Sequence, residues 1–124
     1  MITHIQVATV YVSDQDKALD FYTSILGMSK CVDMPLGPGY RWVEVAPDGA
    51  QTSISLARPA DPAQTLGGFT GFILNTDDVH AFYQTMKSRG VVFSQEPTAQ
   101  PWGGIQASFS DLDGNQFLIA QRTS

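Results

Sequence analysis

A repeated pair of aromatic residues constrains this chain more than any other sequence feature. Phe21 and Tyr22 lie in DKALDFYTSILG, and the same pair returns 61 residues later as Phe82 and Tyr83 in DDVHAFYQTMKSRG. In both segments apolar residues recur at positions i, i+3, i+4 and i+7, the pattern of an amphipathic helix. Two copies at this distance indicate a duplicated supersecondary unit, because a solenoid needs three or more stacked repeats.

Boundary signals surround both predicted helices. Residues with a short side-chain oxygen precede each apolar stripe and can accept a hydrogen bond from the first free N–H groups of a helix. A glycine follows each stripe and tolerates the positive φ of a helix end. The candidate caps are Ser13 or Asp14 for the first helix and Asp77 or Asp78 for the second, and the terminating glycines are Gly27 and Gly90.

Strand signals flank each helix in the same order. β-Branched and aromatic residues alternate with polar ones, and turn formers rich in glycine, proline and aspartate separate the runs. The expected strands are residues 5–12, 29–34, 40–46 and 52–57 in the first half, and 69–76, 91–93, 105–110 and 115–120 in the second. The chain is therefore expected to be an α+β protein with two βαβββ modules, about 1–60 and about 67–124, within a single domain covering 1–124.

Composition excludes several classes of protein. Hydrophobic residues make up 43% of the chain and charged residues 15%, which is ordinary for a soluble globular protein. Twelve acidic residues against seven basic ones disfavour a nucleic-acid partner, since phosphate contacts require lysine and arginine. No segment is apolar enough to span a bilayer, and the N-terminal residues do not match a signal peptide. Together with the single Cys31, expected to be a packing residue, these features predict a cytoplasmic protein without a membrane partner.

Two motifs resemble those of a known family. The helix text Ala18-Leu19-Asp20-Phe21-Tyr22 leading to Leu26-Gly27, and the hairpin Phe109-Ser110-Asp111-Leu112-Asp113-Gly114-Asn115, are similar to the vicinal oxygen chelate superfamily. That superfamily includes glyoxalase I, extradiol dioxygenases and bleomycin-resistance proteins. The resemblance implies a cup-shaped mixed sheet with the helices on its convex side. It also implies frequent pairing of modules across a homodimer, and in the metal enzymes four His or Glu ligands on the concave face.

The four ligand positions of the family carry other residues here. Aligning the helices places Val7 and Gly71 at the first-strand positions, and Ser55 and Leu118 at the last-strand positions. None of these side chains is a useful ligand for zinc, nickel or iron. His4 and His80 are both expected to face solvent. We therefore expect no metal and no other cofactor.

Strand alternation predicts which side chains line the cup. The expected lining mixes aromatic and aliphatic surface with uncharged polar groups, as in small-molecule pockets. It comprises Val7, Thr9, Tyr11, Trp42, Glu44, Ser53, Ser55, Gly71, Ile73, Asn75, Gln106, Gln116 and Leu118, with Trp102 on a Gly-rich loop nearby. Tyr11 and Trp42 have a structural alternative, which is to fill the cup or seal a dimer interface.

Glu44 is the one carboxylate expected in the cup, so it is the candidate catalytic residue. It could act as a general base, or it could form a salt bridge at the rim. Glyoxalase-type isomerisation also needs an electrophile, which in this superfamily is the metal. The sequence therefore favours a metal-independent, homodimeric binding protein for an aromatic or amphipathic small molecule. The alternative is a glyoxalase-like lyase or isomerase, or a dioxygenase-type enzyme, with non-standard active-site residues.

Overall fold

The computed structural model describes residues 1–122 and divides the chain into two compact units. The first unit is Met1–Leu66, and the second begins at Gly67. None of the helices in the described part of the chain is long and apolar enough to cross a membrane.

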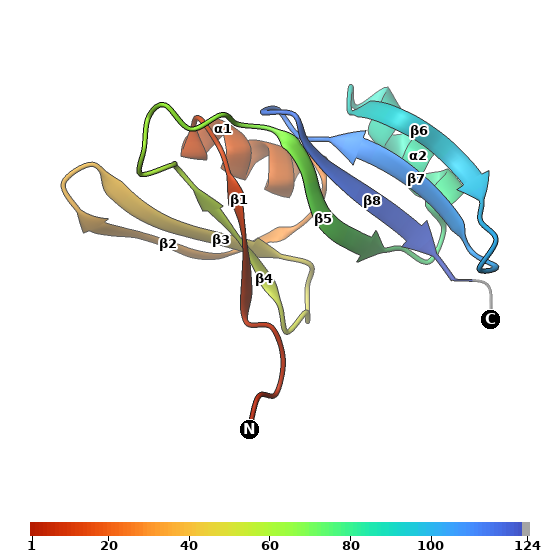
Figure 1. Ribbon diagram of the computed structural model, residues 1–124, viewed down its shortest axis with the longest axis horizontal. Helices are drawn as coiled ribbons and strands as arrows, with labels where there is room; N and C mark the ends of the chain where they lie inside the picture. Colours follow the sequence, from red (N-terminus) through yellow and green to blue (C-terminus); the bar gives the residue numbers. More distant parts are fainter. Residues whose placement is uncertain (123–124) are drawn as a thin grey trace. The chain divides into compact units, whose positions relative to one another are not determined.

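The first unit has the βαβββ order expected from the sequence (Figure 1). Its elements are β1 (Val7–Tyr11), α1 (Gln15–Asp20), the π-helical turn η1 (Phe21–Ile25), β2 (Ser29–Gly37), β3 (Tyr40–Ala46) and β4 (Ser53–Ala57). The strands form one sheet in the order β1-β4-β3-β2. β1 is parallel to β4 and the other pairs are antiparallel, so the sheet is mixed.

The second unit repeats this topology. Its elements are β5 (Gly68–Asn75), α2 (Val79–Ser88), β6 (Val92–Ala99), β7 (Ile105–Ser110) and β8 (Asn115–Gln121). The sheet order is β5-β8-β7-β6, with β5 parallel to β8 and the other pairs antiparallel. Each unit thus has one mixed four-stranded sheet and one helical segment, which confirms the α+β prediction.

The helices begin at one of the two candidate caps in each case. The Oδ1 atom of Asp14 accepts a hydrogen bond from the backbone N–H of Lys17 at 3.0 Å, and Asp78 does the same for Ala81 at 3.0 Å. The sequence predicted one regular helix that ends at Gly27, but the α-helix ends at Asp20. It changes to a π-turn at Phe21, where the N–H of Leu26 bonds to the carbonyl of Phe21.

One face of each sheet packs against the helix of its own unit (Figure 1). In the first unit the buried residues on this face are Val10, Val12, Val43, Val45, Ile54 and Leu56. Strands β3 and β4 contact α1. In the second unit they are Ala107, Phe109, Phe117 and Ile119. Both sets follow the alternation of side chains along the strands.

β6 is longer than the sequence predicted. The expected strand covered residues 91–93, whereas the observed strand extends to Ala99 and includes Pro97. A proline removes one hydrogen-bond donor, so it is tolerated in edge strands and at bulges. β6 meets both conditions, because it lies at the edge of its sheet and its pairing with β7 shifts register between Gln95 and Thr98.

Candidate functional site

The face of the first sheet that points away from α1 carries the candidate site residues of the first unit. We call it the first helix-free face and define it by Val7, Thr9, Tyr11, Trp42, Glu44, Ser53 and Ser55. Val10, Val43 and Leu56, which alternate with these residues, are buried on the helix side. The structure therefore puts all seven predicted residues on one face.

Cross-strand pairing brings three polar residues into a single row. Thr9 on β1 lies opposite Ser55 on β4, and Ser55 lies opposite Glu44 on β3. Directly opposed side chains in a sheet have Cβ atoms about 5 Å apart, so neighbours in this row can bind the same small group. Val7 and Ser53 form the next pair, one step along the same strands.

Glu44 does not form the rim salt bridge that was weighed from the sequence. Its Oε2 atom accepts a hydrogen bond of 2.6 Å from the indole N–H of Trp42, and no ion pair to Glu44 occurs within residues 1–122. The two side chains project from the same strand, two positions apart, and both are half-buried. The bond holds an aromatic ring beside a carboxylate, so the pair presents a stacking surface and a hydrogen-bond acceptor together.

Apolar surface is available on the same face. Tyr11 is 42% exposed at the end of β1. Met34 on β2 is also exposed and lies opposite Trp42 across β2 and β3. Sequence reasoning did not include Met34, because its inclusion depends on the register of β2, which has a bulge after Lys30. The neighbouring Val32, opposite Glu44, was missed for the same reason.

The second sheet has a corresponding face, the second helix-free face, defined by Gly71, Ile73, Asn75, Gln106, Gln116 and Leu118. Ile73 pairs with Leu118, and it is 65% exposed although apolar. Gly71 has a φ of +80° within a register shift of β5, a conformation that favours glycine. Gln106 lies on β7 opposite Ala120, and Gln116 lies opposite Ser110.

Two of these residues line a cavity of about 400 Å³ within the second unit. Its walls are Ile73, Leu74, Asn75, Ala120 and Arg122. Ala120 and Arg122 were missed by the sequence analysis, because their participation depends on the pairing of β5 with β8. Ser108, on β7 opposite Leu118, was also missed, and its Oγ atom bonds to that of Ser94 at 2.9 Å.

Trp102 lies in the loop between β6 and β7 and is 53% exposed. Its ring occupies the space next to the α-carbon of Gly104, where a Cβ atom would lie only 1.8 Å from the indole. The Trp102 ring therefore packs against the backbone at Gly104 and does not project freely into solvent. The structure does not bring it into the strand pairings described for either face.

The four family ligand positions do not fit a metal ion. Val7, Gly71 and Leu118 have no donor atom, and Ser55 offers a neutral hydroxyl. Within residues 1–122 there is also no group of three or more His, Cys, Asp or Glu side chains placed to hold an ion. His4 and His80 are both exposed, as expected.

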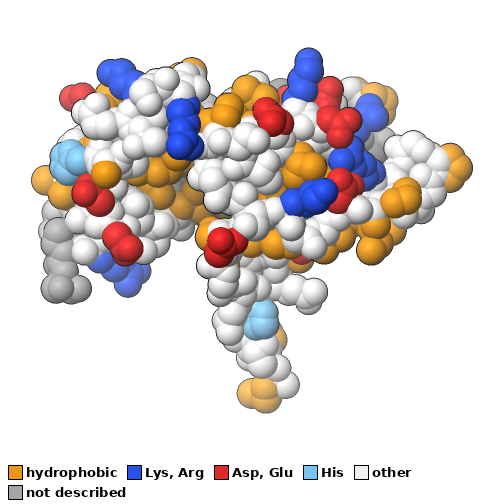
Figure 2. All heavy atoms as spheres, turned by 180° about the vertical axis from the view of Figure 1, so that it is seen from behind, with side chains coloured by type: hydrophobic (Ala, Val, Ile, Leu, Met, Phe, Trp, Pro, Cys, Tyr) orange, Lys and Arg blue, Asp and Glu red, His pale blue; other side chains and the backbone are white. Residues whose placement is uncertain are grey.

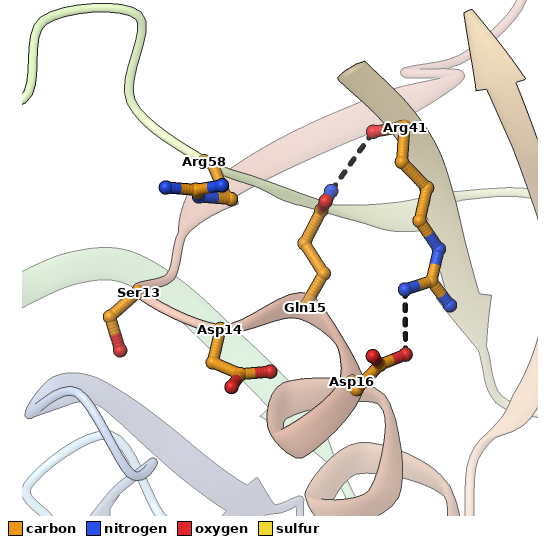
Figure 3. Close-up of a pocket in the computed structure, with 6 residues that line it drawn as sticks. All are labelled: Ser13, Asp14, Gln15, Asp16, Arg41 and Arg58. Carbon is orange, nitrogen blue, oxygen red and sulfur yellow. Dashed lines mark hydrogen bonds and ion pairs between the residues drawn. The ribbon is translucent and has the colours of Figure 1, made fainter. Parts of the chain in front are cut away.

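A further hollow of about 360 Å³ in the first unit is lined by Ser13, Asp14, Gln15, Asp16, Arg41 and Arg58 (Figure 3). Arg41 binds Asp16 at 2.6 Å and Asp33 at 2.7 Å, and the Arg41 guanidinium lowers the pKa of the Asp33 carboxyl. The Nε2 atom of Gln15 donates to the carbonyls of Arg41 and Leu56. Arg41, Asp16, Asp33 and Gln15 are thus bound within the chain, so on this side the hollow is a structural ion-pair network.

Side chains of both signs lie next to one another over the first unit, on the right of Figure 2. This surface is therefore not a basic patch.

Comparison with known proteins gives a consistent result. The family model described as Glyoxalase/Bleomycin resistance protein/Dioxygenase superfamily matches residues 2–119. The uncharacterized protein YetH from Bacillus subtilis (strain 168) is 36% identical over 121 residues, covering 98% of this chain and 100% of YetH. A member of the same superfamily from Sphaerobacter thermophilus DSM 20745 is 44% identical, with a TM-score of 0.93 and 98% of each chain covered.

A second solved structure is TnmS3, an antibiotic binding protein from Streptomyces sp. CB03234. It is 43% identical, with a TM-score of 0.87 and 98% of each chain covered. The model match over nearly the whole chain and these relatives lead to one conclusion. This chain belongs to the Glyoxalase/Bleomycin resistance protein/Dioxygenase superfamily.

Proposed function

We propose that this protein binds an aromatic or amphipathic small molecule through its helix-free faces, without a metal ion. The observation that carries the proposal is the first helix-free face, where the bonded pair Trp42 and Glu44 lies beside the hydroxyl groups of Thr9 and Ser55. Aromatic surface combined with a few fixed polar groups suits recognition of a small organic molecule. The likeness to TnmS3, an antibiotic binding protein, supports the same function.

The enzymatic alternative has less support. Glu44 is the one carboxylate on the first helix-free face, and one of its oxygens is occupied by the Trp42 indole. The family positions that hold a metal in the enzymes carry side chains that do not fit one, so the residues present offer no electrophile for an enediolate oxygen. Binding is the function that these residues support best.

Oligomeric state and location complete the proposal. We propose a cytoplasmic homodimer, in which apolar strand residues such as Ile73 are covered by a second copy of the chain. Static light scattering should give twice the chain mass of 13.5 kDa at micromolar concentration. A mass corresponding to one chain would contradict the dimer but leave ligand binding open.

Substitution of Trp42 by alanine is expected to weaken binding of an aromatic ligand about 2- to 10-fold. Stacking on an aromatic ring contributes about 0.5–1.5 kcal/mol beyond area burial, which gives this range. A library of planar compounds is first screened by quenching of tryptophan fluorescence, and calorimetry then measures affinity in the variant. Trp42→Phe keeps a ring but removes the N–H that bonds to Glu44, so it separates stacking from the hydrogen bond.

Leu112→Ala is the control, because Leu112 is a large exposed apolar residue in the turn between β7 and β8, outside both helix-free faces. It should leave the affinity unchanged. An unaltered affinity in Trp42→Ala, or loss of its folded circular dichroism spectrum, would assign Trp42 a structural role.

Metal analysis is expected to find far less than one transition metal ion per chain after purification without chelator. The physical reason is that Val7, Ser55, Gly71 and Leu118 replace the ligands at the four family positions. Calorimetric titration with zinc, nickel and iron should likewise show no stoichiometric tight site. One firmly held ion per chain would refute metal independence.

A further inference from the structure

Ser55 carries a buried hydroxyl group that has no hydrogen-bond partner in the described part of the chain. The residue is 1% exposed, and its Oγ atom bonds to no group in residues 1–122. Buried polar atoms in folded proteins are nearly always hydrogen-bonded, because desolvation without a partner costs free energy. On a helix-free face, a bound molecule is one source of the missing partner.

The position of Ser55 shows which groups such a partner would meet. Ser55 lies on β4 with Thr9 on one side and Glu44 on the other. The hydroxyl does not bond to either neighbour, although both lie directly opposite it in the sheet. A small polar group placed over the row could reach Ser55 and Glu44 at the same time.

The charge of the row indicates what kind of group fits. Glu44 is the one charged residue of the first helix-free face, and it has no cationic partner within the described residues. Its Oε2 atom accepts the Trp42 N–H, and no bond from the described residues to Oε1 is present. A half-buried carboxylate is stabilised by hydrogen-bond donors and disfavours a second anion nearby.

We infer that the row Thr9, Ser55 and Glu44 is a specificity subsite for a hydrogen-bond-donating group on the ligand, a hydroxyl or a protonated amine attached to an aromatic ring. The donor bonds to the Glu44 carboxylate and to the Ser55 hydroxyl, while the ring lies against Trp42. Ligands with a carboxylate at this position are rejected by Glu44. The inference rests on the proposed function and adds the class of ligand.

The test uses three probes that share one ring and differ in the terminal group: 2-(1-naphthyl)ethylamine, 2-(1-naphthyl)ethanol and 3-(1-naphthyl)propionate. Amide chemical shifts in NMR titrations give their dissociation constants for the full chain. The amine and the alcohol should bind at least fivefold more tightly than the propionate. Ser55→Ala should weaken the amine and the alcohol severalfold, and Glu44→Gln should remove the preference for the amine over the propionate.

Thermal unfolding of the ligand-free protein supplies a second measurement. Ser55→Ala removes an unsatisfied hydroxyl, so its midpoint should rise by about 2–6 °C while the donor probes bind less well. A purely structural role of the hydroxyl would lower the midpoint instead. Ser24→Ala and Asp20→Asn, both at exposed helical positions, are matched controls and should change neither quantity.

The outcomes distinguish failure of the subsite from failure of the proposed binding function. Equal affinities for the three probes, or donor binding unaffected by Ser55→Ala and Glu44→Gln, overturns the subsite while the binding function stands. A lowered midpoint in Ser55→Ala also overturns it. Failure of all three probes to shift any amide overturns the subsite and the proposed function together.

Discussion

Replacement of Phe109 by alanine is expected to lower the free energy of unfolding by about 3–5 kcal/mol, the usual cost of truncating a buried phenylalanine. Phe109 is fully buried and is the centre of the aromatic cluster of the second unit. Its ring centroid lies 5.5 Å from those of Phe82 and Phe117 and 6.0 Å from that of Phe93. Alanine would remove one packing partner from each of these three rings and open a cavity in the core.

Urea unfolding followed by both fluorescence and circular dichroism measures this effect, and coincident transitions establish that a single free energy applies. Phe69→Ala is the matched control, since Phe69 is the same residue type and 62% exposed. It should change the free energy by no more than about 0.5 kcal/mol. Similar midpoints for the two variants would contradict the assignment of Phe109 to the core.

Substitution of Asp111 by alanine should cost about 2–3 kcal/mol of unfolding free energy, because hydrogen bonds to a charged group contribute about 1.5–3 kcal/mol. The buried carboxylate holds the turn between β7 and β8 together. Its Oδ1 atom accepts from the backbone N–H groups of Asp113 and Asn115, both at 2.9 Å, and its Oδ2 atom accepts from the Asn115 side chain at 2.8 Å. Removal leaves these donors without their acceptor.

Asp111→Asn refines this test. The amide keeps one acceptor oxygen but turns an NH₂ group toward either the backbone donors or the Asn115 amide, so an intermediate loss is expected. Asp77→Ala, at an exposed position before α2, should be nearly neutral. If Asp111→Ala unfolded at the urea concentration of the unsubstituted protein, the turn would not depend on its carboxylate.

The helices illustrate how far periodicity alone can be trusted. The repeated stripe correctly identified both helices and their buried sides, since Ala18, Phe21 and Tyr22 are buried in the first and Val79 and Met86 in the second. It did not show the π-turn that begins at Phe21. That change depends on which backbone carbonyl each N–H selects, and the sequence pattern is compatible with both helical forms.

The sequence pattern also did not decide which residue caps the first helix or how far the edge strand β6 extends. Ser13 and Asp14 can both accept a hydrogen bond from the first turn of a helix, and only the structure shows that Asp14 is the cap that bonds to Lys17. Polar residues and Pro97 weaken the strand signal of β6, so only its first residues were recognised. Its place at the edge of the sheet explains why those residues are tolerated there.

In the candidate site, too, the sequence predicted the local features and the tertiary structure decided the long-range ones. Alternation assigned Thr9, Trp42, Glu44 and Ser55 to one face correctly, because neighbouring side chains in any strand point to opposite sides of the backbone. This is a local property, and a short run of sequence is enough to read it. Whether those residues form a metal-free binding site stays a prediction.

Strand alternation could not predict which residues pair when they are far apart in the sequence. Thr9 and Ser55 are 46 positions apart in the chain, and their pairing depends on the register that β1 and β4 adopt after folding. The Trp42–Glu44 hydrogen bond depends on side-chain distances that neither sequence periodicity nor composition contains. The same holds for Ser55, whose hydroxyl has no partner among residues 1–122. The sequence by itself therefore determined the repeat, the apolar stripes of the helices and the faces of the strands, because these follow from local periodicity. Long-range packing determined which polar groups satisfy one another and left the Ser55 hydroxyl without a hydrogen-bond partner in residues 1–122.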